Sequence, residues 1–240
     1  MAKVGRPPQD PARQLERAHR ILDAAAELIL RWGYDKTTID DVARRAGVAK
    51  GTIYLHWRTR DQLFAALLRR ERVHLFAGIR AKTPATLPEL FGGLVRETLN
   101  RPLLRAVLLG DDEVLGKLTR MKRTSGTSLE LGGPFDAYVA RMIEHGAVRA
   151  EPGDHLTVIS SIVYGFIALP DLLPEAARLP DERIAELVTD TVERAMSTGR
   201  PLPEADRRAV AEATADILDA MEEVARRRLA ASLGSEERGA

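Results

Sequence analysis

The chain has 240 residues, 45% of them hydrophobic, and no cysteine, so it can bury a sizeable core while disulfides and thiolate metal sites are excluded. The net charge of +1 is distributed unevenly along the chain. Residues 1–60 carry 12 Lys and Arg against 7 Asp and Glu, whereas residues 61–240 carry 24 against 28. Because the positive charge is concentrated in one segment, the protein is not expected to bind polyanions along its whole length. We identify no apolar run long enough to cross a bilayer and no signal peptide, and we therefore expect a cytoplasmic protein.

The first predicted element is a long amphipathic helix that follows a short basic arm. Residues 1–9 contain a Pro-Pro pair and scattered cations, and we expect a flexible arm; the alternative is that Arg6 reaches into a minor groove, as homeodomain arms do. Asp10 is a good helix cap and is followed by proline, which is favoured at the first helical position. Apolar residues then recur at helical spacing up to Trp32, which we expect in the core, and Gly33 ends the helix.

Two short helices hinged on a glycine are predicted in residues 38–57. Thr38 can cap the first helix with Asp41 as its partner in a capping box, and Gly47 can adopt the left-handed conformation that ends it. The second helix, residues 51–57, is too short to be stable alone, so its apolar side chains must be held by neighbouring helices. The polar side chains left for a partner are Lys50, Thr52, Tyr54 and His56.

This arrangement is typical of a helix-turn-helix, whose second helix enters the major groove of DNA while the first crosses the backbone. Lys50 is a cation for phosphate or guanine, and Thr52 offers a hydroxyl and a methyl group. Tyr54 and His56 can donate hydrogen bonds to phosphate oxygens. A helical hairpin with a solvated polar face would show the same apolar spacing, but the residue types at the individual positions favour DNA binding.

The tetracycline-repressor (TetR) family of bacterial transcription regulators has a DNA-binding segment that this chain resembles in the run TTIDDVARRAGVAKGTIYLHWRTRDQLF. The positions that agree with the family pattern, without a gap, are Thr38, Val42, Ala43, Ala46, Gly47, Val48, Gly51, Thr52, Ile53, Tyr54, His56 and Leu63. The chain departs at Ala49, where the family often has a Ser or Thr cap worth about 1 kcal/mol, and at Trp57, where Phe is usual. The residues that the resemblance implies as DNA contacts are Thr38, Lys50, Gly51, Thr52, Tyr54, His56 and Arg60.

A long helix is predicted to connect the helix-turn-helix to the rest of the chain. Thr59 and Gln62 form a second capping box, and apolar positions continue at helical spacing to about Ile79. Arg60 in the first turn is placed to meet a phosphate, with a surface arginine of no such role as the equal alternative. The helical pattern ends before Pro84, because the residue preceding a proline is disfavoured in helical space.

All further predicted elements are helical, at residues 87–100, 102–109, 111–123, 134–146, 154–170, 181–198 and 203–233. The expected fold class is all-α, a three-helix N-terminal DNA-binding domain with a helix-turn-helix followed by a C-terminal helical bundle for ligand binding and dimerisation. The expected division is a basic arm (1–9), the DNA-binding domain (10–57), a connecting helix (58–83), the ligand-binding and dimerisation domain (84–200), an appended helix (201–233) and a tail (234–240). Most members of the resembled family stop near residue 200, so we expect the appended helix to cover the bundle or to extend a dimer interface.

The resemblance also implies a homodimer, because the family builds a four-helix interface from two helices of each subunit. Residues 154–169 and 182–197 occupy these places, and the alternative is that their apolar faces belong to the subunit's own core. The residues expected in the interface are Leu156, Ile159, Val163, Ile167, Ile184, Leu187, Val188 and Val192. A twofold dimer would place two reading helices about 34–36 Å apart on a pseudo-palindromic operator.

An effector pocket among the middle helices is a further expectation from the resemblance. The residues expected to line it are Phe91, Phe135, Tyr138, Met142, Ser161 and Tyr164, each with core or surface as its alternative. Glu144, His145 and His155 lack the spacing of a helical metal pair, so we expect no metal and no cofactor.

The function expected from these observations is a DNA-binding transcription regulator, a homodimeric repressor that binds an operator in double-stranded DNA and is released by an unidentified small-molecule effector. The alternatives are an activator or architectural protein without effector control, and an enzyme with an appended DNA-binding domain. The enzyme is disfavoured, because no nucleophile elbow, metal-ligand cluster or phosphate loop occurs in the sequence. We expect the effector to act by shifting the helix at residues 59–79 and so changing the distance between the reading helices.

Overall fold

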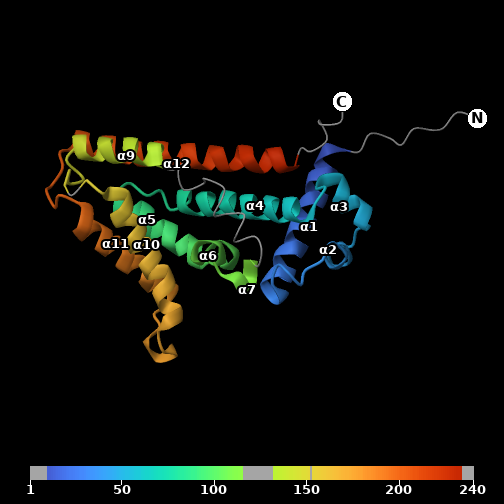
Figure 1. The fold of residues 1–240 in the computed structure, drawn as a ribbon. Helices are drawn as coiled ribbons and strands as arrows, with labels where there is room; N and C mark the ends of the chain where they lie inside the picture. Colours follow the sequence, from blue (N-terminus) through green and yellow to red (C-terminus); the bar gives the residue numbers. More distant parts are fainter. Residues whose placement is uncertain (1–9, 116–131, 152, 234–240) are drawn as a thin grey trace, which may run out of the picture.

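The computed structural model describes residues 10–115, 132–151 and 153–233, and the elements in these ranges are helical apart from an isolated bridge between Val148 and Ser197. The helices are α1 (Pro11–Trp32), α2 (Ile39–Ala46), α3 (Lys50–His56), α4 (Arg60–Arg80), α5 (Leu87–Leu99), α6 (Pro102–Leu109), α7 (Asp112–Leu115), α9 (Gly132–Glu144), α10 (His155–Leu172), α11 (Asp181–Met196) and α12 (Glu204–Leu233), with a 3-10 turn at Glu175–Ala177 (Figure 1). The predicted all-α fold class is therefore confirmed. The expected arm and tail, and most of the helix expected at residues 111–123, lie outside the described residues.

Local sequence signals set the ends of the N-terminal helices. Thr38 and Asp41 form the predicted capping box at the start of α2, and Gly47 ends this helix in the left-handed conformation, with a φ of 66°. The Thr59 hydroxyl accepts from the amide of Gln62 at 3.1 Å and starts α4. In the predicted capping box the Gln62 side chain would accept from the amide of Thr59. In the structure it accepts instead from the amide of Arg58, the preceding residue, at 2.8 Å.

A first hydrophobic core joins α1, α2 and α3 to the beginning of α4. Ile53 and Trp57 are buried in it, and so is Tyr34, whose ring meets Phe64 edge-to-face at a centroid distance of 4.8 Å. The expectation that Trp32 lies in the core is wrong, because its side chain is 41% exposed. Since α1 ends at Trp32, the turn that follows it brings Tyr34 into the core instead.

A second core lies between the far half of α4 and helices α5, α9, α10, α11 and α12. Helices α5 and α11 approach closely at Gly92, where a Cβ atom would lie 1.9 Å from Oγ1 of Thr189. A larger residue would have to displace the Thr189 hydroxyl, and its Cβ atom would lie 3.1 Å from the carbonyl oxygen of Ala185, so glycine permits this close approach.

The two cores are connected at several points besides the continuous helix α4. The backbone amide of Tyr34 donates to the carbonyl of Val114 in α7 at 2.8 Å. Leu103 of α6 is buried as part of the first core. The N-terminal helices are therefore attached to the bundle through α6 and α7 as well as through α4.

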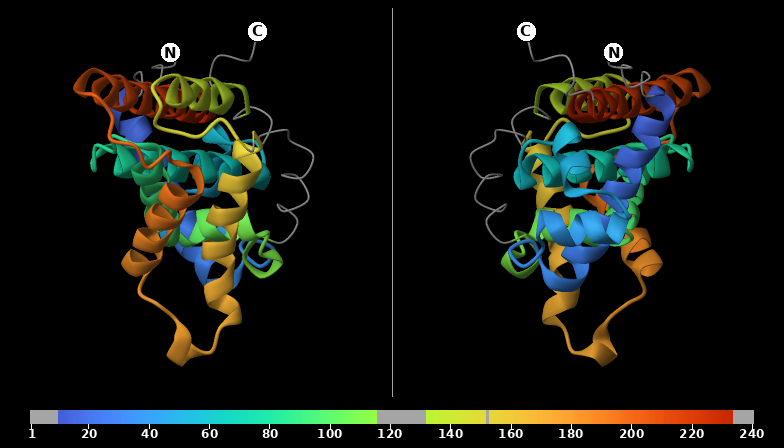
Figure 2. Two further views of the ribbon diagram at one scale, coloured as in Figure 1. Left: turned by 90° about the vertical axis from the view of Figure 1, so that its left-hand side faces the viewer. Right: turned by 90° about the vertical axis from the view of Figure 1, so that its right-hand side faces the viewer.

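The long helix α12 runs antiparallel to α4 and also packs on α9, which covers the bundle as expected for residues 203–233 (Figures 1 and 2). The guanidinium Nε of Arg80 donates to the carboxylate of Glu222 at 2.7 Å. The hydroxyls of Tyr138 on α9 and Thr214 on α12 lie 2.9 Å apart. Side chains of α4 and α9 thus hold α12 in place.

Helix α10 is the most membrane-like helix of the described residues in composition. Its 18 residues have a mean hydropathy of 1.4, and only 22% of them are buried, so by length and composition it could cross a bilayer. This corrects our expectation that no apolar run reaches that length. The helix also continues past Pro170, its expected end, to Leu172, because a proline in the last turn removes only one helical hydrogen bond. Figure 2 shows this end of α10 projecting from the body of the molecule, and Leu172 is 80% exposed.

Candidate nucleic-acid interface

Helix α3 is anchored on one side and open on the other. Ile53 and Trp57 are both buried, which fixes the helix against α1, α2 and the start of α4. The turn at Gly47 sets the entry to α3, since the amide of Val48 donates to the carbonyl of Ala43 at 3.0 Å. The exposed side of α3 is therefore held in a fixed orientation by the core behind it.

The structure brings most of the sequence-predicted DNA contacts to the outer side of α3. Lys50, Gly51 and Tyr54 are exposed, and Tyr54 retains 44% of its accessible surface. Thr52 and His56 are half-buried at the edge of this side. A Cβ atom added to Gly51 would meet nothing within 4 Å, so no contact inside the described chain requires glycine at this position.

Lys50 has a partner within the protein. Its ammonium group donates to the carboxylate of Asp40 on α2 at 2.7 Å, and both side chains are about half exposed. This hydrogen bond raises the pKa of Lys50 above its ordinary value. A phosphate that binds Lys50 must compete with Asp40.

The start of α3 lacks a side-chain cap. Ala49 stands at the N-cap in an extended conformation and makes no capping hydrogen bond, as its side chain dictates. Amides of the first turn of α3 consequently remain available at the end of the helix that carries Lys50. An anion at this position would be stabilised by these amides and by the helix dipole.

Thr38 and Arg60 are both occupied by contacts inside the protein. The Thr38 hydroxyl donates to Asp41 at 2.5 Å and accepts from the Asp41 amide at 3.2 Å. Arg60 donates to three backbone carbonyls of the connection between α1 and α2, at 3.2 to 3.4 Å, and its guanidinium lies 4.2 Å from the centre of the Tyr34 ring. Arg60 thus fixes the α1–α2 connection, which the phosphate-contact interpretation did not anticipate.

Sequence reasoning missed the cluster of Tyr34 and Asp61 beside Arg60. The Tyr34 hydroxyl donates to the Asp61 carboxylate, and burial together with this carboxylate raises the pKa of Tyr34 to about 12. The available signals were an aromatic residue directly after the helix-ending glycine and an acid in the first turn of α4. The cluster fixes the first turn of α4 against the end of α1.

The structure corrects most of the expected dimer interface. The residues that are buried inside the subunit, and so cannot form a contact surface, are Ile159, Val163, Ile167, Ile184, Val188 and Val192. Leu187 is half-buried, and Leu156 is exposed. The apolar faces predicted for the two helices are those that α10 and α11 turn toward the core.

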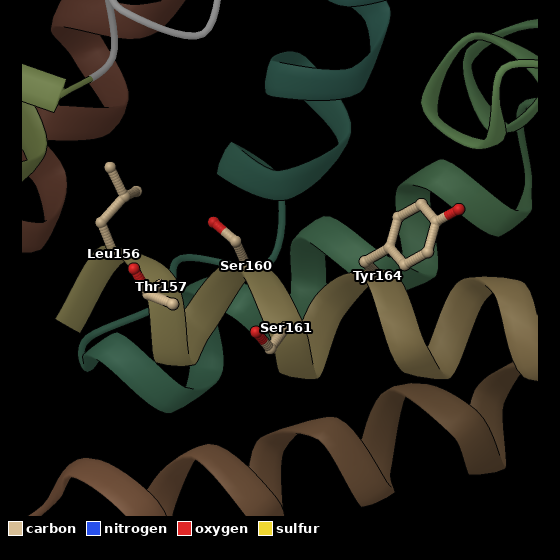
Figure 3. A pocket seen from close by; sticks show the side chains of 5 residues that line it. All are labelled: Leu156, Thr157, Ser160, Ser161 and Tyr164. Carbon is tan, nitrogen blue, oxygen red and sulfur yellow. The ribbon is translucent and has the colours of Figure 1, made fainter. Parts of the chain in front are cut away.

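The six residues expected in an effector pocket do not surround one space. Phe135, Tyr138 and Met142 are buried in the second core, and Phe91 packs against it. Ser161 and Tyr164 instead lie on the outer side of α10, with Leu156, Thr157 and Ser160, along a shallow depression of about 460 Å³ (Figure 3). No group of three or more His, Cys, Asp or Glu that could hold a metal occurs among the described residues.

A short helix fixed in a three-helix core, with a second helix before it and a polar outer face, defines a helix-turn-helix protein. Residues 21–67 match the family described as bacterial regulatory proteins, tetR family. Residues 21–67 of this chain thus correspond to the DNA-binding region of the TetR family of transcription regulators.

Similar proteins of known sequence share mainly the N-terminal region. The transcriptional activator FasR of Mycolicibacterium smegmatis is 33% identical over 93 residues, 39% of this chain and 37% of that protein. The regulator YvdT of Bacillus subtilis is 35% identical over 63 residues, 26% of this chain and 32% of that protein. The aligned stretches thus span about a third of these relatives. The transcriptional repressor TetR of Mycobacteroides abscessus is 27% identical, over 55% of this chain and 93% of that protein.

The fold is also found among solved structures. A protein described as a transcriptional regulator from Streptomyces coelicolor aligns with a TM-score of 0.55 at 22% identity, over 76% of this chain and 98% of its own. A likeness at this identity concerns the arrangement of the helices. The N-terminal helix-turn-helix and the C-terminal helical domain of this chain are therefore those of a TetR-like fold.

Proposed function

We propose that this protein is a homodimeric transcriptional repressor that binds a pseudo-palindromic operator in double-stranded DNA and leaves it when a small molecule binds. The observation that carries the DNA-binding part is the outer side of α3, where Lys50, Gly51 and Tyr54 are exposed on a helix anchored from behind. A rigidly held helix that offers a cation, a hydroxyl and an open stretch of backbone suits the major groove.

Each exposed group has a proposed role. Lys50 leaves Asp40 for a phosphate or a guanine, and Tyr54 donates its hydroxyl to a phosphate oxygen. Gly51 lets the backbone approach the duplex, since nothing in the described chain fills the space beside it. Thr52 and His56 act at the edge of the contact. Thr38 and Arg60, being occupied internally, position α2 and the α1–α2 connection.

The dimer is proposed to form through the outer side of α10. Leu156, Ser160 and Tyr164 follow one another along this side, one helical turn apart (Figure 3). The apolar composition of α10 and its low burial in the single chain are explained if a second copy covers this face. Small residues such as Ser160 would let the two helices approach closely.

The effector is proposed to bind in the second core. Phe91 and Phe135 meet edge-to-face at 6.0 Å, and Phe135 precedes Tyr138 by about one turn of α9, where the Tyr138 hydroxyl lies 2.9 Å from that of Thr214. A ligand that breaks this pair would move α9 relative to α12, and α12 lies along α4, which carries the reading domain. A coupling of about 1–3 kcal/mol would relieve repression several-fold to a hundredfold.

The experiment that tests this function is selection of operator sequences from random duplexes by the full chain, followed by gel shift and sedimentation with the selected duplex. We expect enrichment of an inverted repeat bound by a dimer. The absence of any enriched sequence would contradict the DNA-binding proposal, and binding of a single half-site by a monomer would contradict the dimer.

The direction of regulation needs its own measurement, because FasR is named an activator and the Mycobacteroides protein a repressor. We expect a reporter placed behind the selected operator to be expressed less when this protein is present. Increased expression would identify an activator instead. An effector would be recognised by mass spectrometry of the purified protein, and effector-bound and free dimers with equal operator affinity would contradict the proposed release.

A further inference from the structure

A groove of about 470 Å³ lies where the C-terminal end of α12 meets the N-terminal helices. Its three walls come from the first half of α1, the end of α3 and the last third of α12, and Figure 1 shows this end of α12 beside the start of α1. The volume falls within the range of about 300–1,000 Å³ that is usual for small-molecule sites. Because the appended helix supplies one wall, a chain that ended near residue 200 would lack this groove.

All three walls of the groove carry leucine side chains. Leu15 of α1 is 48% exposed and Leu55 of α3 is 58% exposed, so about half of each side chain is open to solvent. Leu229 and Leu233 complete the apolar lining from α12. Apolar side chains that are grouped in a concave place, and left uncovered there, are typical of a binding site.

The walls are held in place by contacts outside the groove. The side chain of Arg69 on α4 donates to the hydroxyl of Ser232, which fixes the end of α12. On α3, Ile53 and Trp57 flank Leu55 in the sequence and are both buried in the first core. The groove is therefore built on anchored helices, and a ligand would find its walls already in position.

The polar side chains of the groove favour an anionic group. No Asp or Glu lines it among the described residues, and its polar members are Gln14, His19, His56 and Arg226. Arg226 is 62% exposed, and its Nη2 group donates to Glu222 at 2.5 Å. A guanidinium has five N–H donors, so this ion pair uses only part of its capacity. A carboxylate in the groove would thus meet a cation, whereas an ammonium group would be repelled by it.

We propose that the groove between α1, α3 and α12 binds a small carboxylic acid with an aliphatic body. The hydrocarbon covers Leu15, Leu55 and Leu229, and the carboxylate accepts hydrogen bonds from Arg226, which it shares with Glu222. Such a ligand touches the reading helix and the appended helix at once. The site is separate from the effector site proposed in the second core, and it does not depend on operator binding, because it can be tested without DNA.

The ligand test measures binding of octanoate to the full chain by calorimetry and by thermal unfolding, in the absence of DNA. Octanol and octylammonium carry the same hydrocarbon body without the negative charge, and acetate carries the charge without the body. These three compounds separate the contribution of the leucines from that of the arginine.

Two substitutions in the groove are each compared with a matched control outside it. Leu15→Glu places an acid in the groove, and Leu30→Glu makes the same change at a residue of α1 that is 45% exposed and does not line the groove. Arg226→Gln removes the cation, and Arg227→Gln removes the same charge from an exposed neighbour paired with Glu223.

We expect the parent, Leu30→Glu and Arg227→Gln to bind octanoate equally. Arg226→Gln should bind it about tenfold more weakly, because a charged hydrogen bond is lost. Leu15→Glu should bind it more weakly still, because like charges repel in the groove. Octanol, octylammonium and acetate should each bind the parent at least tenfold more weakly than octanoate does, about the effect of one such bond or of a few buried methylene groups.

Three outcomes would overturn the proposal. The first is that the parent does not bind octanoate, and the second is that Leu15→Glu and Arg226→Gln bind it as well as their controls do, which would place the ligand elsewhere. The third is that Leu15→Glu dissociates an oligomer in sedimentation without octanoate, which would show that a second copy of the chain fills the groove. Thermal unfolding without ligand shows whether Leu15→Glu is folded, and Arg226→Gln decides the matter if it is not.

Discussion

Glu222 is a buried acid in the seam between α4 and α12, and Glu222→Gln should measure what this seam contributes to stability. Its carboxylate is 5% exposed and accepts from Arg80 at 2.7 Å and from Arg226 at 2.5 Å. Glutamine keeps the shape and one acceptor but loses the charge. Hydrogen bonds to charged groups stabilise by about 1.5–3 kcal/mol against about 1 kcal/mol for neutral ones. Because both arginines are well exposed, we expect a loss of about 1–2 kcal/mol in the free energy of unfolding.

Thermal and urea unfolding of the full chain would measure this loss, which corresponds to a decrease in Tm of about 2–8 °C for a protein of this size. The hydrogen bond from Arg80, and then that from Arg226, lowers the pKa of Glu222 below its ordinary value of 4.5. Because the pKa of Glu222 is lower in the folded state than in the unfolded chain, this group stabilises the fold fully at pH values above its ordinary pKa. The stabilisation is lost as the pH falls through the lowered pKa. The difference between parent and variant should therefore be complete at pH 7 and vanish in acid.

Glu223→Gln is the matched control, since Glu223 pairs with Arg227 at 2.6 Å but is 53% exposed. This pair is solvated, so its loss should change stability little. Equal destabilisation by the two substitutions would refute the argument that burial makes Glu222 important, and a difference that persists below the lowered pKa would refute the role of its charge.

Further predictions concern α3 and the dimer. Lys50→Ala and Tyr54→Phe should weaken operator binding without unfolding the protein, and unchanged gel shifts for both would remove them from the interface. If Lys50 meets a phosphate, Lys50→Ala should also reduce the slope of log affinity against log salt concentration by about one. Asp40→Asn should strengthen operator binding at low salt by releasing Lys50, and weaker binding would show that Asp40 orients the lysine instead. Ala49→Ser should stabilise α3 by about 1 kcal/mol in urea unfolding, as the cap it lacks would do. Ser160→Arg should dissociate the dimer in sedimentation, whereas an intact dimer would place the interface elsewhere.

The helix-turn-helix could be predicted from the sequence because its determinants are local. The capping box of Thr38 and Asp41, the glycine at residue 47 and the apolar spacing that buries Ile53 act within a few residues of one another. The start of α4 and the presence of α12 were predicted on the same grounds. The sequence therefore indicates both the reading helix and the side of it that faces outward.

The faces of α10 and α11 could not be predicted in the same way. Ile159 and Val188 point into the subunit, while Leu156 and Tyr164 point outward, yet all four are apolar or aromatic positions. Helical periodicity identifies the core-facing side most clearly when the opposite side is charged, and the outer side of α10 instead mixes Leu156 and Tyr164 with Thr157, Ser160 and Ser161. Which face meets the core depends on α5 and α11, whose packing no local pattern specifies.

The role of Arg60 depends on contacts that are distant in sequence. Its partners are the carbonyls of Tyr34, Asp35 and Thr37, more than 20 residues earlier. From sequence alone, an arginine at the first position of this helix is compatible equally with a phosphate contact and with a surface arginine of no such role. Only the folded arrangement reveals that the guanidinium is already occupied by carbonyl groups.

The hydrogen bond from the Tyr34 amide to the Val114 carbonyl joins main chain to main chain. Replacing either side chain leaves both atoms in place, so an alanine scan would overlook this junction, and only proline at position 34, which has no N–H, would abolish it outright. This link between the N-terminal helices and the bundle therefore does not depend on which side chains stand at the two positions, so a comparison of residue identities would not reveal it.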